Sequence, residues 1–318
     1  MKQQTDATPI KRSFKDYLRI FFCGSVMGAA DVVPGVSGGT MAFILGIYSE
    51  LLDSIKNILS PRTVKLACQF KIKTLYKTLP WPFLAALGLG ILTSIGIFSS
   101  HIAWMLENRL ALILAFFFGL ILGSVATVLR QVSKWSVDRC IALIIGAVTG
   151  YLAVGLPALS SPPEGKWYLV LCGAIAISAM ILPGISGSFM LLLLGKYKYI
   201  LSAVNDLKSR INVVDNLVTL GLFCVGLVFG IAFFCRFLSW LLKKYNDLTV
   251  AVLIGFMLGS LRKVWPWKAA GNISNANVMP EFSSSLLLPV ILAVAGFLLV
   301  LAIEYIARRI EMKNGEKL

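Results

Sequence analysis

The segment from Met27 to Ile55 recurs in altered form 149 residues further along the chain. The first copy contains MGAADVVPGVSGGTMAFILGIYSELLDSI, and the second contains MILPGISGSFMLLLLGKYKYILSAV. In each copy an apolar run of about 16 residues precedes a break of the form Pro-Gly-aliphatic-Ser-Gly, and a second apolar run follows the break. As an α-helix such a run covers ~24 Å, which is less than the ~30 Å hydrocarbon core of a bilayer. Each copy therefore predicts a re-entrant helical hairpin with its tip at membrane depth.

The composition excludes a soluble globular protein. Hydrophobic residues occupy 58% of the 318 positions, charged residues occupy 14%, and the mean hydropathy is +0.82. A soluble fold would leave too much of this apolar surface in water, so a polytopic α-helical membrane protein is expected. The six cysteines are scattered singly, without the paired spacing of a disulfide framework or a metal site. We therefore expect no bound metal and no cofactor.

The net charge of +15 does not indicate a nucleic-acid partner. Most lysines and arginines gather in segments that would lie on one side of the membrane, which is the positive-inside pattern of cytoplasmic loops. The basic N-terminus and the apolar run at 20–30 would also fit a cleavable signal peptide. The matching run at 167–182 is internal and needs no such explanation, which favours a hairpin in the mature protein.

The basic segments also predict the order of elements across the membrane. The expected order is a cytoplasmic segment 1–18, repeat 1 at 19–156 (hairpin 19–55, then spans 81–105, 110–129 and 140–156), an external linker 157–166, repeat 2 at 167–305 (hairpin 167–204, then spans 217–242, 248–261 and 285–305) and a cytoplasmic tail 306–318. This topology puts Arg262, Lys263 and Lys268 outside, where they are an exception to the positive-inside pattern.

Three spans follow each hairpin, and because three is an odd number the second repeat is inverted relative to the first. The expected fold is thus an all-α polytopic membrane protein of two inverted repeats, each a re-entrant helical hairpin plus three transmembrane helices. Inverted repeats with interrupted helices are typical of secondary transporters that bind their substrate near the bilayer midplane.

Both breaks are candidate anion sites. A helix that restarts after the Pro-Gly pair has unpaired N–H groups and a partial positive charge at its first turn, glycines let an anion approach, and hydroxyls cap the helix or donate to the ligand. The predicted phosphate-binding residues are Gly35, Ser37, Gly38, Gly39, Thr40, Gly184, Ser186, Gly187 and Ser188. Alternatively, the motif only forms a tight turn whose serine caps its own helix; two copies in opposite orientations favour the anion site.

Five charged residues are candidates for substrate contact or ion coupling. Asp31 precedes the first break, where an acid beside an anion has to be protonated, paired or cation-bound, so it either couples a proton or ion or acts as a structural cap. Glu50 and Arg130 also fit the cytoplasmic interface. Arg236 fits either a snorkelling side chain or a phosphate partner, and Lys196, expected toward the outer interface, either attracts an anionic head group or snorkels.

The segments GAADVVPGVSGGTMAFILGIYSELL and LPGISGSFMLLLLGKY resemble the two signature segments of the PopT-type polyprenyl-phosphate translocases, a family formerly known only as a bacterial membrane domain of unknown function. The resemblance covers about residues 15–305. It implies a multi-pass protein of the bacterial cytoplasmic (inner) membrane with both termini in the cytoplasm. It also implies transport of undecaprenyl phosphate, the C55 lipid carrier of cell-wall synthesis, from the outer to the inner leaflet for reuse. The expected partners are this lipid and the bilayer; proton or ion coupling and a homo-oligomer stay open.

Two rival functions remain. Undecaprenyl-pyrophosphate phosphatases also have inverted repeats and a Pro-Gly-x-Ser turn, but their turn continues with Arg-Ser-Gly. Here Gly38-Gly39 and Gly187-Ser188 follow the two serines, with no arginine in either loop, and the chain has one histidine. Phosphoryl transfer without a charge clamp, a base or a metal site is hard to support, so we expect no catalytic residues. An ion-coupled symporter of a small anion is the third candidate.

Overall fold

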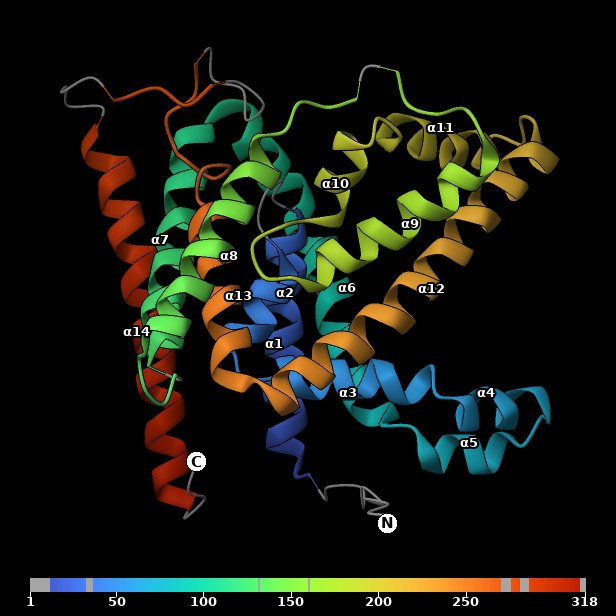
Figure 1. Ribbon diagram of the computed structural model, residues 1–318, viewed down its shortest axis with the longest axis horizontal. Coiled ribbons are helices and arrows are strands. Elements are labelled where there is room, and N and C mark those ends of the chain that lie inside the picture. The colour runs from blue at the N-terminus through green and yellow to red at the C-terminus, as the bar shows by residue number, and fades with distance from the viewer. Residues whose placement is uncertain are drawn as a thin grey trace.

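The protein is all-α, as predicted. A computed structural model describes residues 12–32, 37–130, 132–159, 161–269, 276–280 and 286–314 (Figure 1). The helices are α1 Phe14–Val32, α2 Gly38–Ile44, α3 Tyr48–Ile58, α4 Pro61–Cys68, α5 Ile72–Thr78, α6 Trp81–Asn108, α7 Leu110–Leu129, α8 Val137–Gly155, α9 Lys166–Ile181, α10 Gly187–Leu193, α11 Tyr197–Lys208, α12 Val213–Lys244, α13 Asn246–Ser260 and α14 Leu287–Asn314. Within the described ranges the only β-pairing is an isolated bridge between Lys268 and Asn277.

Five of these helices are long and apolar enough to cross a membrane: α6, α7, α8, α12 and α14. They correspond to five of the six predicted spans, so the multi-pass membrane character is confirmed. The sixth prediction, 248–261, falls on α13, an apolar helix of only 15 residues. At 1.5 Å per residue α13 covers ~23 Å, which is shorter than a full crossing of the hydrocarbon core.

Most of the tertiary structure consists of four closely packed helix pairs: α1 with α6, α9 with α12, α7 with α14, and α8 with α13. Glycines allow these close approaches, because a side chain would enter the partner's backbone. A Cβ on Gly119 of α7 would overlap the carbonyl group of Ala293 in α14, and one on Gly255 of α13 would overlap that of Leu143 in α8. Small residues at helix contacts are typical of membrane bundles, where packing and not the hydrophobic effect drives association.

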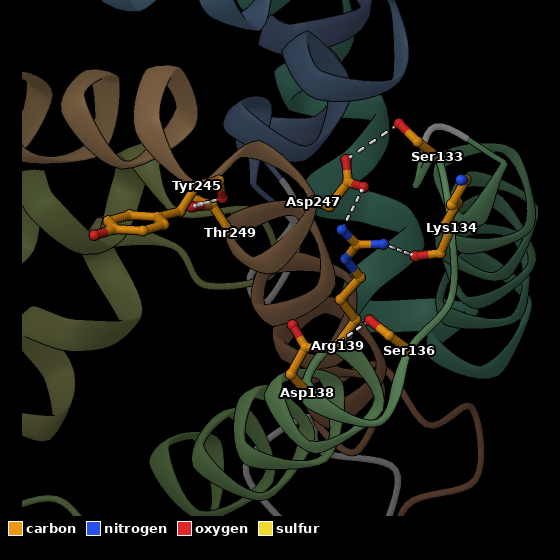
Figure 2. Close-up of polar contacts among 8 residues, drawn as sticks. All are labelled: Ser133, Lys134, Ser136, Asp138, Arg139, Tyr245, Asp247 and Thr249. Atoms are coloured by element: carbon orange, nitrogen blue, oxygen red, sulfur yellow. Dashed lines mark hydrogen bonds and ion pairs between the residues drawn. The ribbon is translucent and has the colours of Figure 1, made fainter.

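A cluster of polar contacts joins α8 to α13 where both helices begin. Arg139 forms an ion pair with Asp247, with 3.3 Å between the guanidinium nitrogen and the carboxylate oxygen, and the Ser133 hydroxyl donates to the same carboxylate (Figure 2). Arg139 also donates to the carbonyl of Lys134 in the α7–α8 turn. These contacts fix the start of α8 against the start of α13.

The connecting segments gather at two opposite ends of the molecule (Figure 1). At the end drawn lowermost, here called the lower end, α1 begins, α14 ends, α4 and α5 lie, and the α7–α8 and α12–α13 turns occur. At the opposite, upper end lie α11, the segment between α8 and α9, and residues 261–269. The described parts of the segments predicted for the cytoplasm thus share one end, and those of the segments predicted for the outside share the other. Which end faces the cytoplasm stays a prediction.

The two repeated segments approach each other in the middle of the bundle. α1 rises from the lower end and leads through α2 to α3, whereas α9 descends from the upper end and leads through α10 back to α11 (Figure 1). We call the turn before α2, with the first residues of that helix, the first tip (described from Ser37 to Thr40). The turn before α10, with the first residues of that helix, is the second tip (residues 182–188). The inverted-repeat and re-entrant predictions concern placement in a bilayer, and they stay predictions.

Candidate functional site

At the first tip the polar groups are bonded within the protein. Ser37 is the N-cap of α2: its hydroxyl oxygen accepts from the backbone N–H of Gly39 at 3.1 Å and donates to the carbonyl of Met180 at 3.1 Å. Ser37 and Thr40 are fully buried. Gly35, another predicted ligand, lies outside the described residues. Ser37 therefore caps its own helix, as the alternative to an anion site expects, and it also contacts the end of α9.

The side chain of Asp31, a residue of α1, lies at the N-terminal end of α2. Its Oδ1 accepts from the backbone N–H of Gly38 at 2.7 Å, and a Cβ added to Gly38 would lie 2.6 Å from its Oδ2. A carboxylate at this position is favourable because it pairs an otherwise unbonded helical N–H and complements the helix dipole. Within this structure the carboxyl group of Asp31 takes the position next to the Gly38 N–H at the first tip.

Thr40 and Tyr48 connect the two tips. The hydroxyl oxygen of Thr40 accepts from the backbone N–H of Gly184 at 2.8 Å, and the Tyr48 hydroxyl donates to the carbonyl of Ile181 at 2.9 Å. Gly184 has φ +100°, a conformation that a residue with a side chain rarely adopts, and a Cβ there would lie 2.7 Å from the hydroxyl oxygen of Ser260. The two tips thus form one buried unit, with Ser260 of α13 against the second tip.

The second tip resembles the first in its cap but not in its charge. The hydroxyl oxygen of Ser186 accepts from the backbone N–H of Phe189 at 3.2 Å and lies 3.0 Å from that of Ser188. Gly187 starts α10, and Ser188 is exposed. Asp31 has no counterpart here, because the equivalent position in the second copy is Met180.

The other four charged candidates lie away from the tips. Glu50 pairs with Arg12 at 2.7 Å, and Arg236 donates to the carbonyl groups of Ala232 and Leu59. The ammonium group of Lys196 lies over the rings of Tyr168 and Tyr199, at 5.9 and 5.1 Å from their centroids. Arg130 is the C-cap residue of α7 at the lower end. Of the five charged candidates, the structure brings only Asp31 to the tips.

Two mainly apolar pockets lie along α12 and share two lining residues. The first has a volume of about 530 Å³ and is lined by Leu182 and Ile185, which flank the second tip, and by Phe229 and Phe233. The second has a volume of about 510 Å³, shares Phe229 and Phe233, and is an open groove on the exposed surface of α12, lined by that helix alone as far as Arg236 and Trp240. Sequence reasoning did not find the first cavity, because its walls come from α8, α9, α12 and α13, which are distant in the chain.

A further cavity, of about 520 Å³, lies at the upper end. Arg262, Lys263 and Lys268 line it, so the residues that form the exception to the positive-inside pattern share one site. That exception was the one sequence signal for them. Among the described residues, no group of three His, Cys, Asp or Glu side chains is arranged to hold a metal ion.

Fold and tips together define a multi-pass helical membrane protein whose two homologous segments join at a buried polar centre. The chain belongs to the undecaprenyl phosphate translocase-like family: residues 27–282 match the family model described as VCA0040-like: Undecaprenyl phosphate translocase-like. This confirms the family resemblance predicted from the two motifs.

Two curated relatives are similar to this chain. A protein of Vibrio cholerae serotype O1 named polyprenyl-phosphate transporter is 41% identical over 312 residues, which cover 92% of this chain and 98% of the relative. A Staphylococcus aureus protein of the same name is 30% identical over 259 residues, covering 76% of this chain and 84% of the relative. No solved structure matches the chain.

Proposed function

We propose that this protein carries a polyprenyl phosphate across the bacterial cytoplasmic membrane without chemical change. Family membership and the names of both relatives support this function. The structural observation that carries it is the second tip, where a buried polar centre adjoins an apolar cavity through Leu182 and Ile185. A lipid phosphate needs both features at once, because its head group requires polar contacts while its long isoprenoid tail stays in an apolar environment.

In this proposal the lower end faces the cytoplasm and the two halves are inverted repeats with re-entrant hairpins. The basic residues of the lower-end segments support this orientation. The helix pairs support the symmetry: α1 with α6 in the first half has its counterpart in α9 with α12. In the repeats α7 corresponds to α13 and α8 corresponds to α14. Exchanging the halves therefore turns the pair α7 with α14 into the pair α13 with α8, which is also present. The tips then lie at membrane depth, where a transporter can expose its site to either side.

The phosphate is proposed to bind between the tips, at backbone and hydroxyl groups of the predicted ligands. In the structure the N–H groups of Gly38, Gly39 and Gly184 are bonded to Asp31, Ser37 and Thr40. A phosphate at the first tip therefore has to replace Asp31. Two unit charges 4 Å apart repel by about 4 kcal/mol at an effective dielectric constant of 20, so an ionised Asp31 opposes the phosphate strongly. Protonation of Asp31 would remove this charge, weaken its bond to the Gly38 N–H and couple transport to a proton.

The isoprenoid tail is proposed to follow the two apolar cavities along α12. Phe229 and Phe233 belong to both cavities and are largely exposed at the helix surface, at 68% and 73%. The tail can therefore remain partly in the surrounding lipid while the head group crosses. In the proposed direction the head group moves from the outer to the inner leaflet, which returns undecaprenyl phosphate for reuse.

The proposal is tested with the purified full chain in liposomes that carry a fluorescent short-chain polyprenyl phosphate. Loss of the probe from the outer leaflet, measured with a membrane-impermeant quencher, should be faster than in protein-free liposomes. In a parallel assay with a polyprenyl pyrophosphate, inorganic phosphate in the supernatant should stay at the background level. Phosphate release at turnover rates would make the protein a phosphatase, uptake of free phosphate without lipid movement would make it a symporter, and either result contradicts the proposal.

A further inference from the structure

The cation-lined cavity at the upper end is distinct from the tips and has no role in the transport cycle described so far. Arg262 and Lys263 follow Leu261, the C-cap residue of α13, and Lys268 lies five residues after Lys263. All three side chains are half-buried and line the same cavity of about 520 Å³. Three cations in one cavity repel one another, so a bound anion would stabilise them.

Neutral groups hold these three cations in the structure. The Arg262 guanidinium lies over the ring of Tyr151, 4.3 Å from its centroid, and donates to the Tyr151 carbonyl. The Lys263 ammonium lies 4.3 Å from the centroid of the Phe189 ring. Lys268 donates to the side-chain oxygen of Asn277 and to the carbonyl of Arg262. Among the described residues, none of the three cations forms an ion pair with a carboxylate.

The pKa of Lys268 reflects this surplus of positive charge. Burial, together with the neighbouring charges of Lys263 and Arg262, lowers the pKa of Lys268 to about 8. Burial also lowers the pKa of Lys263. Among the described residues, the remaining walls bring no acid toward Lys268: residues 151–158 at the end of α8 and residues 187–193 of α10 contain no charged side chain, and Asn277 is neutral. A bound anion would offset the cost of keeping these half-buried lysines charged.

The cavity lies close to the second tip. Phe189, Leu192 and Leu193 of α10 form one wall, and α10 has only seven residues, or ~10 Å of helix, and begins within the tip at Gly187. The opposite wall contains Arg262 and Lys263, which come shortly after Ser260 in the chain, and the hydroxyl of Ser260 lies against Gly184. A head group held by the cations is thus one short helix away from the joined tips. The leucine side chains beside it provide apolar contact for the first isoprene units of a lipid.

We propose that Arg262, Lys263 and Lys268 form a receiving site for a phosphomonoester head group at the upper end, before it reaches the tips. Guanidinium and ammonium groups suit this ligand, because arginine donates two parallel hydrogen bonds to phosphate and lysine adds point charge. The shared chemistry is a phosphate dianion, and the proposed source is a polyprenyl phosphate in the leaflet at this end. The choice of lipid rests on the proposed function, whereas the anion site itself rests on the cavity.

The test measures binding to the full chain in phosphatidylcholine nanodiscs, which present no competing anionic lipid. The probes are farnesyl phosphate, inorganic phosphate and uncharged farnesol. Arg262→Gln combined with Lys268→Gln should weaken farnesyl phosphate binding at least tenfold. Lys166→Gln is the matched control, because it removes a cation at the same end that is already paired with Asp215 at 3.4 Å. The control should stay within twofold of the unmodified protein, and farnesol should bind equally to all three.

The pH dependence separates direct contact from a structural effect. Affinity for farnesyl phosphate should fall between pH 7 and pH 9 as Lys268 loses its proton, since the second ionisation of a phosphomonoester, near pH ~6, is already complete. Lys268→Arg should retain its affinity better at pH 9, because arginine keeps its charge. This single variant also keeps the test decisive if the double variant does not fold. Identical pH profiles for Lys268→Arg and the unmodified protein would contradict the proposal.

Two outcomes distinguish this site from the proposed function. If the unmodified protein moves the lipid and the double variant binds and moves it equally well, the receiving site is wrong while the function stands. If no lipid moves but farnesyl phosphate binding still depends on Arg262 and Lys268, the site stands and the function is wrong. Equal affinity for inorganic phosphate and farnesyl phosphate would assign the site to free phosphate and overturn the receiving role.

Discussion

The hydrogen bond from the Gly184 N–H to the Thr40 hydroxyl oxygen offers the most direct test of the joined tips. Thr40→Val keeps the shape of the side chain but removes the acceptor. Thr40 is 0% exposed and Gly184 is buried, so water cannot replace the lost partner. An unpaired buried N–H costs ~1 to 3 kcal/mol, and the equilibrium constant of unfolding should therefore rise roughly 5- to 140-fold.

The matched control is Thr249→Val. The Thr249 hydroxyl donates to the carbonyl of Tyr245 at 2.8 Å, but that carbonyl also accepts from the Thr249 backbone N–H at 2.9 Å (Figure 2). The control therefore leaves no group without a partner, and its unfolding free energy should change by less than ~0.5 kcal/mol. Reversible unfolding in mixed micelles, followed by tryptophan fluorescence, measures both variants. Equal stability of Thr40→Val and Thr249→Val would show that this bond does not hold the tips together.

Three further predictions address coupling, the first tip and topology. Asp31→Asn should abolish the pH dependence of lipid movement in liposomes while the protein remains folded; an unchanged pH profile would leave Asp31 with a structural role. Gly38→Val should stop lipid movement, because its side chain would displace the Asp31 carboxylate, and normal transport by a monodisperse variant would contradict the proposed phosphate site. A cysteine placed at Lys65 should react with an impermeant maleimide only from the cytoplasm, and cysteines at Glu164 or Asp206 only from outside. Labelling of the last two from opposite sides would refute a re-entrant second segment.

The sequence predicted the helical class and five of the spans because long apolar runs in a membrane have few alternatives to a helix. It also located both tips, since Pro, Gly and Ser at fixed offsets mark a helix break and a cap. The contacts between the tips were missed. The bonds from Gly184 to Thr40 and from Tyr48 to Ile181 join residues 144 and 133 positions apart, and no local pattern encodes such pairing.

The position of Asp31 was predicted only in part. The sequence left open whether this acid couples ions or caps a helix, and the structure shows its carboxylate bonded to the Gly38 N–H, seven positions away. Arg236, Glu50 and Lys196 were candidates because charge is expensive in a membrane. Their partners are two backbone carbonyls, an arginine and two aromatic rings, and no motif in the sequence announces any of these contacts.

The pairing of α7 with α14 has a consequence for how the protein is made. The last residue of α7 is Leu129, and the first of α14 is Leu287, so 158 residues must be synthesised before α7 meets its partner. At ~5 to 20 residues per second this takes roughly 8 to 30 s. During that interval the glycine-bearing face of α7 lies in lipid or against the insertion machinery. A ribosome that stalls after the first half would leave a fragment with its packing faces open to quality-control proteases.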